Sequence, residues 1–526
     1  MSRRLASGVV TLPGPTALAW GLVAACAAGR IAMAQPAPPR PDVPAAMRAI
    51  RQADLERDLR IHASDAARGR EAGTVDEMRA SAWLADELRR IGVKPAGPDG
   101  SYFQWWTMVR TRHSAAGSRA AIGSRPLALW RDVIPIAGLN IDVRGQVVWL
   151  AGPDDSTDVR GKVAALRMVP STVPPRTTTN TPQVRWTTAA TAYTAGRMAM
   201  RGAALVVIVA DSIADSAFDD VATIRARGTY DVDDAAPRFA TQPRRLAPVP
   251  PPGAPLAAGA ASPVVLVRAG LAPELMQRPE LDLSLRAERF EVPSVNVVGV
   301  VAGTDKARRD EYVLFSSHQD HDGVRYNVNG DSVWAGADDN GSVTVALLAA
   351  ARAFVRQPGK RSALFVWHGA EEKGLLGSRW HAAHPVVPIT QIVAVLNGDM
   401  IGRNHPDSAT LLGVQPPHRN SSDLVAHALR ANARTGTFVL DSLWDRPTHP
   451  EGWYFRSDHV PYARMGIPAV MFTTNLHDDY HTPRDTPARI DYAKLTRMAQ
   501  WMYLTGWYVA NAPERPRTDE GFKLER

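Results

Sequence analysis

The chain has 526 residues, which is too long for a single hydrophobic core and predicts two or three domains. Its net charge of +8 comes mostly from arginines spread along the sequence, without the dense basic stripe or recognisable module of a nucleic-acid-binding protein. The single cysteine, Cys26, lies close to the N-terminus, so we expect no disulfide and no thiol nucleophile in the folded body.

Residues 1–34 have the organisation of an export signal. A short basic start is followed by mostly apolar sequence from Leu5 to Ala25, and Ala32-Met33-Ala34 fits the small-x-small pattern of a cleavage site. Two alternatives stay open: an uncleaved membrane anchor, and lipid attachment at Cys26, where Val23–Cys26 resembles a bacterial lipobox. All three place the folded body outside the cytoplasm, as a periplasmic, secreted or lipid-anchored protein, and a cleaved form would have no transmembrane span.

A proline-rich linker, residues 35–44, leads into the N-terminal part of the main domain at residues 45–126. A helical stretch is expected to begin near Ala45. The clearest helix is Asp76–Ile91, because its apolar residues recur at helical spacing and Gly92 follows as a stop.

Residues 127–283 are expected to form a β-rich insert that is separate from the main domain. Strand-like runs occur at Gly145–Leu150 and Lys162–Leu166. The segment 158–163 and the later Gly202-Ala203-Ala204 resemble a protease-associated (PA) domain. Because the insert carries no metal-ligand motif, we expect it to act as a lid or substrate gate and to take no part in the chemistry.

Residues 284–512 contain four short apolar runs rich in Val, Leu, Ile and Phe. Such runs predict strands that are buried on both faces of a parallel sheet. The predicted fold class is therefore α/β, with a mixed, mostly parallel central sheet flanked by helices, followed by a polar tail at 513–526. The four runs are Tyr312–Ser317, Ser362–Trp367, Ile392–Leu396 and Ile467–Phe472.

Potential metal ligands accompany these runs in an ordered series. Three ligand motifs directly follow a run, a fourth follows after a short loop, and one precedes the helical stretch Gly341–Val355. The carboxyl ends of parallel strands are where ligands bind in open α/β sheets. Two imidazoles and three carboxylates suit zinc, and they fit two ions if one carboxylate bridges. The five residues are His318, Asp339, Glu372, Asp399 and His481.

Around these residues the sequence resembles the M28 zinc aminopeptidases. The motifs H-x-D, G-A-D-D-N-G, A-E-E-x-G-L-x-G-S, a strand ending in D-M, and Y-H-T-x-x-D-T occur in the order found in that family. The segment Gly69–Gly73 resembles its N-terminal G-R-x-x-G element. Val343 stands where relatives commonly have Gly, a difference expected to affect helix packing more than chemistry.

The resemblance implies the zinc exopeptidase fold, two Zn²⁺ ions per chain and a role for each ligand. It implies that His318 and Asp399 hold one zinc ion. It also implies that Glu372 and His481 hold the other, with Asp339 bridging the two. Glu371 would be the general base.

The residues themselves support separate roles at the site. Glu371 and Glu372 are neighbours just past a strand end, so one can ligate while the other takes the proton of a metal-bound water. His318 and Asp320 lie two apart on an extended strand, so Asp320 is expected to fix the imidazole tautomer. For Tyr480 two interpretations stay equally open: donation to the tetrahedral oxyanion, as in some relatives, or packing.

Three functions remain open. The first is a two-zinc exopeptidase that hydrolyses the N-terminal peptide bond of peptides or proteins. The second is a single-zinc glutaminyl cyclase, and the third is a non-catalytic ectodomain of the same fold. Carboxypeptidases and dipeptidases share this metal chemistry, so the choice of the amino end rests on the resemblance alone.

Other histidine and aromatic side chains have less specific interpretations. His381 and His384 are three apart and are predicted to be surface residues, because no further ligands surround them. A run of aromatic residues before Ser457-Asp458-His459 either lines a substrate pocket or belongs to the core, and we favour the core. These residues are Trp444, Trp453, Tyr454 and Phe455.

Overall fold

The computed structural model describes residues 42–170, 181–232 and 262–525. The predicted export signal, Cys26 and most of the proline-rich linker lie outside these residues. Within them, no helix combines the length and the apolar character needed to cross a membrane.

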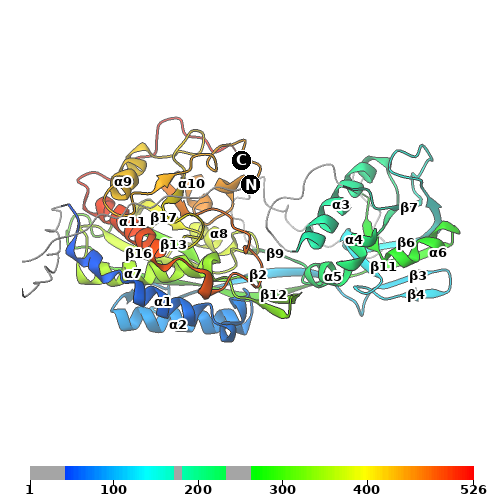
Figure 1. The fold of residues 1–526 in the computed structure, drawn as a ribbon, viewed down its shortest axis with the longest axis horizontal. Coiled ribbons are helices and arrows are strands. Elements are labelled where there is room, and N and C mark those ends of the chain that lie inside the picture. The colour runs from blue at the N-terminus through cyan, green and yellow to red at the C-terminus, as the bar shows by residue number, and fades with distance from the viewer. Residues whose placement is uncertain (1–41, 171–180, 233–261, 526) are drawn as a thin grey trace, which may run out of the picture. The chain divides into compact units, whose positions relative to one another are not determined.

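A ten-stranded mixed sheet forms the centre of the main domain (Figure 1). Its strand order is β19-β18-β20-β17-β13-β16-β12-β2-β9, and β1 pairs with β12. The bounds are β1 (Lys94–Pro95), β2 (Phe103–His113), β9 (Thr229–Val232), β12 (Ala287–Val301), β13 (Tyr312–His318), β16 (Ser362–His368), β17 (Ile392–Gly398), β18 (Ser408–Leu412), β19 (Val439–Leu440) and β20 (Ala469–Thr473).

The four predicted strands are confirmed as β13, β16, β17 and β20, and they are adjacent and parallel. Alternate side chains of β13 pack on opposite faces of the sheet, as strand geometry requires. Val313 and Phe315 join one hydrophobic cluster, whereas Leu314 joins another on the other face. Burial on both faces explains why these strands are continuous apolar runs in the sequence.

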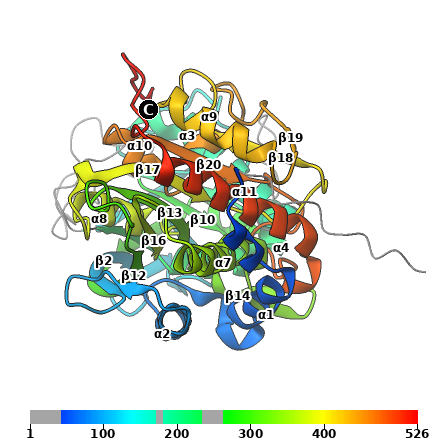
Figure 2. The same cartoon turned by 90° about the vertical axis from the view of Figure 1, so that its left-hand side faces the viewer.

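Helices cover both faces of this sheet. On one face α7 and α11 pack against β13 and β16, and Figure 2 shows both in front of the sheet. Residues of α1 and α2 join the same hydrophobic cluster. On the other face α8 and α10 contribute Ala382 and Tyr462 to the second cluster. The predicted helix Asp76–Ile91 is confirmed as α2, with Gly92 in the left-handed conformation after it. The bounds are α1 (Gln52–His62), α2 (Val75–Ile91), α7 (Val343–Arg356), α8 (Leu376–Ala383), α9 (Ser422–Asn432), α10 (Val460–Arg464) and α11 (Tyr492–Asn511).

A second, eight-stranded sheet is built from the segment between β2 and β12. Its order is β4-β3-β11-β6-β7-β8-β10-β5, and the helices α3 to α6 belong to the same segment. The predicted insert boundary at residue 127 falls at the end of β4, because the hairpin β3–β4 already pairs with β11. The bounds are β3 (Arg119–Ile122), β4 (Arg125–Leu127), β5 (Val133–Ala137), β6 (Ile141–Trp149), β7 (Val163–Arg167), β8 (Leu205–Val209), β10 (Val264–Val267), β11 (Glu280–Leu285), α3 (Pro182–Met198), α4 (Ser212–Ser216), α5 (Phe218–Ala226) and α6 (Ala272–Met276).

The prediction that His381 is a surface residue is wrong. His381 lies on α8 and is fully buried, and its Nδ1 is 2.7 Å from the hydroxyl of Tyr462 on α10. His384, directly after the helix, is exposed as predicted. Because α8 is short and packs against α10, three-residue spacing alone does not show which side of the helix is covered.

Candidate metal centre

The five predicted ligands converge at the carboxyl ends of the parallel strands. His318 is the last residue of β13, and Asp399 directly follows β17. Glu372 lies in the loop after β16, and His481 lies in the loop after β20. Asp339 comes from the irregular turn Ala337–Ser342 that leads into α7. Segments far apart in the sequence therefore supply one compact cluster, as expected for this edge of an α/β sheet.

One group of ligand atoms consists of His318, Asp339 and Asp399. The Nε2 atom of His318 lies 3.2 Å from Asp339 Oδ1 and 3.6 Å from Asp399 Oδ1. His318 is essentially inaccessible, at 1% side-chain exposure. An unpaired buried charge is costly, so carboxylates this close to an imidazole indicate a site built for a cation.

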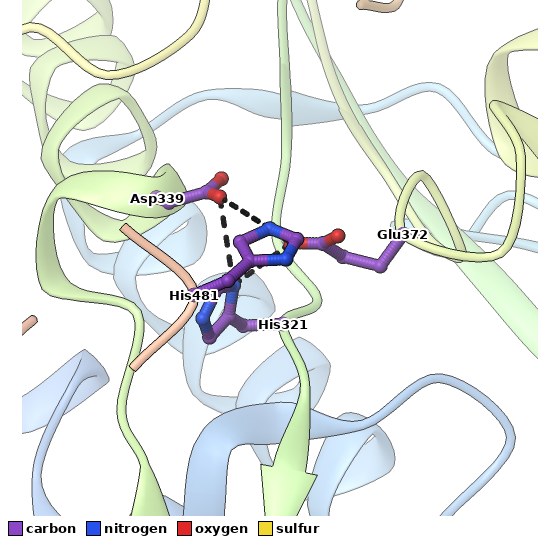
Figure 3. Close-up of side chains that lie close together, drawn as sticks. All are labelled: His321, Asp339, Glu372 and His481. Carbon is purple, nitrogen blue, oxygen red and sulfur yellow. Dashed lines mark hydrogen bonds and ion pairs between the residues drawn. The ribbon is translucent and has the colours of Figure 1, made fainter. Parts of the chain in front are cut away.

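The second group contains a residue that the sequence analysis did not include, His321 (Figure 3). Its Nδ1 atom lies 2.8 Å from Glu372 Oε1. His481 Nε2 lies 3.1 Å from the same oxygen and 3.0 Å from Asp339 Oδ2. Asp339 thus faces both groups, with one carboxylate oxygen toward each. A mixed set of imidazole and carboxylate donors suits zinc, and a shared carboxylate is what a bridged pair of ions needs.

The charges at the site are strongly coupled. Burial raises the pKa of the Glu371 carboxyl well above its usual range; His318 opposes this, whereas the charges of Glu372 and Asp399 add to it. Burial acts in the same direction on Glu372, but His481 and His321 outweigh it and hold that pKa well below its usual range. A bound cation would favour the charged form of every carboxylate here.

Glu371 lies beside the first group, at nearly the same distance from the His318 imidazole as the ligand Asp399. Its Oε2 atom is 3.8 Å from His318 Nε2, and its side chain retains 10% exposure. Its neighbour Glu372 points toward His321 and His481. The two adjacent glutamates therefore face different groups, as their predicted roles require.

The Asp320 carboxylate has a different partner from the one predicted. Its two oxygens accept the backbone N–H groups of Glu371 at 3.0 Å and Glu372 at 3.3 Å. The Nδ1 atom of His318 instead contacts the backbone carbonyl of Asp320 at 3.1 Å, and the carboxylate is 3.9 Å away. Asp320 therefore orients the glutamate loop, and its main chain orients the imidazole.

The Gly69–Gly73 motif has a structural explanation in Arg70. This fully buried guanidinium donates to the carbonyl oxygens of Gln319, Ala335 and Gly336 at 2.7 to 3.0 Å, and also to His62. Burial lowers its pKa to about 10 despite the nearby carboxylates. One side chain thus fixes the loop after His318 and the loop before Asp339.

Two further contacts hold the Asp339 turn. The carboxylate of Asp485, in the Y-H-T-x-x-D-T motif, accepts the backbone N–H groups of Asp338 and Asp339 at 3.0 to 3.1 Å. Val343 is buried, and its side chain occupies the space that a Cβ on Gly398 would need. The unusual valine is therefore accommodated by packing next to Asp399, in agreement with the expected effect on packing.

Tyr480 lies against the site with an arginine behind it. Arg456 donates from one nitrogen to the Tyr480 hydroxyl at 3.1 Å and from another to Glu451 at 2.7 Å. Its guanidinium also lies 4.7 Å from the ring of Trp453. Burial raises the pKa of Tyr480 well above its usual range, with Arg456 opposing the shift, so the phenol keeps its proton.

The aromatic run before Ser457 belongs mainly to the core, as favoured from the sequence. Trp453 and Tyr454 are buried in a cluster with Tyr480, and Trp444 and Phe455 pack against that cluster. Because this cluster supports Tyr480, it helps to position one wall of the site.

The chain is similar in sequence to known peptidases. Residues 296–505 match the model of peptidase family M28. The chain is 26% identical to aminopeptidase YwaD of Bacillus subtilis over 49% of this chain and 53% of that protein. It is 29% identical to leucine aminopeptidase 1 of Arthroderma otae over 40% of this chain and 56% of that protein. The chain spans about half the length of these curated relatives.

Two solved structures share the fold along nearly the whole of their own chains. The aminopeptidase from Aneurinibacillus sp. strain AM-1 matches with a TM-score of 0.51 and 18% identity, covering 91% of this chain and 97% of that one. BSAP, a zinc aminopeptidase from Bacillus subtilis, matches with the same TM-score and identity, covering 90% and 99%. At this identity the similarity concerns the fold.

Proposed function

We propose that the chain is a two-zinc aminopeptidase of peptidase family M28, whose model matches residues 296–505, and that it acts on peptides or proteins with a free amino end. The observation that carries the proposal is the pair of ligand groups that share Asp339, with Glu371 beside the first group. The relatives described above are aminopeptidases, which supports the choice of reaction.

The residues divide into ligands and a base. His318, Asp339 and Asp399 would hold one zinc ion, and Asp339, Glu372 and His481 would hold the other. Zinc ions bound there would supply Lewis-acid activation of water and of the scissile carbonyl. Glu371 would take the proton of the attacking water and return it to the leaving amine, because its carboxylate lies beside the first group while its neighbour Glu372 contacts the second.

The alternatives make different predictions about the metal. A single-zinc glutaminyl cyclase would contain about one ion per chain, and a non-catalytic ectodomain would need none. Asp339 favours the two-zinc function over both, since its two carboxylate oxygens face different ligand groups, as a bridge between two ions would require. Elemental analysis of the purified chain therefore separates the three functions.

The proposal predicts that the enzyme requires a free amino terminus. A protonated amine is attracted by the carboxylate of Glu371, which is not assigned to an ion, whereas an acetyl cap removes the charge of the amine and adds bulk. We expect an N-acetylated peptide to be cleaved at least about 10²-fold more slowly than its free counterpart, with C-terminal amidation having little effect. The measurement is kcat/KM for matched free, acetylated and amidated peptides by product chromatography.

The opposite pattern would identify a peptidase that uses the same metal chemistry on a different substrate. If amidation abolished cleavage and acetylation did not, the enzyme would be a carboxypeptidase. If only dipeptides were hydrolysed, it would be a dipeptidase.

We also propose that Tyr480 donates its hydroxyl proton to the developing oxyanion and that Arg456 positions it. Since the phenol oxygen already accepts from Arg456, its proton is free to point elsewhere. Tyr480→Phe should lower kcat by about 10²-fold with little change in KM. Arg456→Met should lower kcat by about 10-fold, the value of a hydrogen bond from a charged donor.

A double-variant cycle tests this arrangement. In the Tyr480→Phe background, Arg456→Met should have almost no further effect on kcat, because the hydroxyl that it positions is gone. Additive losses, with unchanged thermal stability, would show that Arg456 acts independently of Tyr480.

Export of the protein is the remaining part of the proposal. The organisation of residues 1–34 supports a periplasmic or secreted location, with lipid attachment at Cys26 as the alternative. The PA-like segment is proposed to gate substrates, because the ligand atoms that the structure describes all come from outside the eight-stranded sheet.

A further inference from the structure

We propose that His321 is a fourth protein ligand of the second zinc ion, so that the two ions have unequal surroundings. One group would then be closed by four protein ligands, His321, Asp339, Glu372 and His481. The other group would keep three, His318, Asp339 and Asp399, and an open position beside Glu371. This inference rests on the proposed two-zinc function and specifies which ion leaves room for the reaction.

The spacing of the four donor atoms fits a single tetrahedral ion. Zinc bonds of 2.0–2.1 Å to nitrogen and oxygen place ligand atoms about 3.3 Å apart in a tetrahedron. His321 Nδ1 lies 2.8 Å from Glu372 Oε1 and 3.8 Å from Asp339 Oδ2. His481 Nε2 lies 3.1 Å and 3.0 Å from the same two oxygens. Three of these separations are somewhat shorter than the tetrahedral value and one is somewhat longer.

The local backbone is shaped to admit the His321 ring. Gly336 has a left-handed φ of +60°, and a Cβ at this position would lie 2.4 Å from the imidazole. His321 is fully buried and meets the ring of His481 edge to face, with centroids 5.1 Å apart and the planes at 84° (Figure 3). Two rings at right angles direct their nitrogens toward the same two carboxylates without clashing.

A hydrogen bond that merely orients Glu372 accounts for less of this geometry. Such a bond needs one carboxylate oxygen, whereas His321 Nδ1 approaches both Glu372 and the oxygen of Asp339 that faces His481. His318 has a similar arrangement in the first group, because its Nδ1 contacts the Asp320 carbonyl while its Nε2 faces the carboxylates. Each of the three histidines thus presents a single nitrogen to the cluster, as ligands do.

Unequal coordination has a chemical consequence. A zinc site filled by four protein ligands is closed and retains its ion, whereas a site with three protein ligands keeps a position for a reactant. The open group is also the one nearest to Glu371. The asymmetry therefore places the reacting water on the side of His318 and Asp399.

X-ray absorption at the zinc edge tests the inference on the full chain loaded with two zinc ions. Imidazole scattering should correspond to three histidines per two ions, from His318, His321 and His481. A value of two histidines per two ions would overturn the proposal, and this measurement requires no variant. It is independent of peptide hydrolysis, so an inactive chain with three histidines per two ions would refute the proposed function and leave this inference standing.

Substitution provides a second readout. In His321→Gln, a chelator competition should show at least a 10-fold loss of affinity for one of the two ions, and the ion that is harder to remove in the unaltered protein should be the one weakened. His427→Gln is the matched control, because His427 is a half-buried histidine on α9 outside both groups. Equal chelator profiles for the two variants, with unfolding temperatures unchanged, would contradict the proposal.

Discussion

Glu371→Gln is expected to reduce kcat by at least about 10²-fold while both zinc ions stay bound. Glutamine keeps the size of the side chain and its backbone N–H bond to Asp320, but it cannot accept a proton. The ligand atoms of the two groups are unaffected, since Glu371 lies 3.8 Å from the nearest histidine nitrogen. Steady-state kinetics and elemental analysis on the same preparation measure the two effects together.

The neighbouring glutamate supplies the matched control. Glu372→Gln should lower zinc content as well as turnover, because Glu372 contacts both His321 and His481 within 3.1 Å. Adjacent, chemically identical substitutions should therefore separate a base from a ligand. Near-normal turnover of Glu371→Gln would remove this residue from the mechanism.

The strands of the central sheet were predictable because their burial leaves a direct trace in the sequence. Strands covered on both faces must be apolar at every position, so Tyr312–Ser317 and its three counterparts stand out from their surroundings. Three ligand motifs, those of His318, Glu372 and Asp399, were visible for the related reason that each directly follows such a strand. The order of these four strands, and the other strands of the ten-stranded sheet, came from the structure.

His321 was missed because its place in the site depends on contacts distant in sequence. Glu372 and His481, the residues that it approaches, lie 51 and 160 positions away, and the room for its ring comes from the conformation of Gly336. A histidine three residues after His318 carries a local signal, since the motif is His318-Gln319-Asp320-His321. That signal alone does not distinguish a ligand from a surface residue.

Asp320 illustrates a different limit. The strand geometry correctly places Asp320 near His318, but a carboxylate has more than one donor within reach, and here two backbone N–H groups of the Glu371 loop take both oxygens. Arg70 is a third case, because a short motif revealed its position while its carbonyl partners appear only in the folded chain. Proximity was predictable in both cases, and the choice of partner was not.

Asp339→Ala is expected to lower the zinc content of both groups at once, from about two ions per chain to well below one. The reason is that Asp339 directs Oδ1 to His318 at 3.2 Å and Oδ2 to His481 at 3.0 Å. Removing the carboxylate also deprives both zinc ions of the negative charge that they would share. His318→Ala, by contrast, should mainly empty the first group and leave about one ion per chain.

The comparison of these two variants tests the bridge itself. The backbone of Asp339 is held by Asp485 and the preceding loop by Arg70, so the turn should keep its conformation when the carboxylate is removed. Shared coordination therefore predicts that Asp339→Ala loses more zinc than His318→Ala. The comparison holds if the metal-free chains of the two variants unfold at the same temperature. Full zinc content in Asp339→Ala would refute the bridging role, because a carboxylate that links two ions cannot be removed without weakening both.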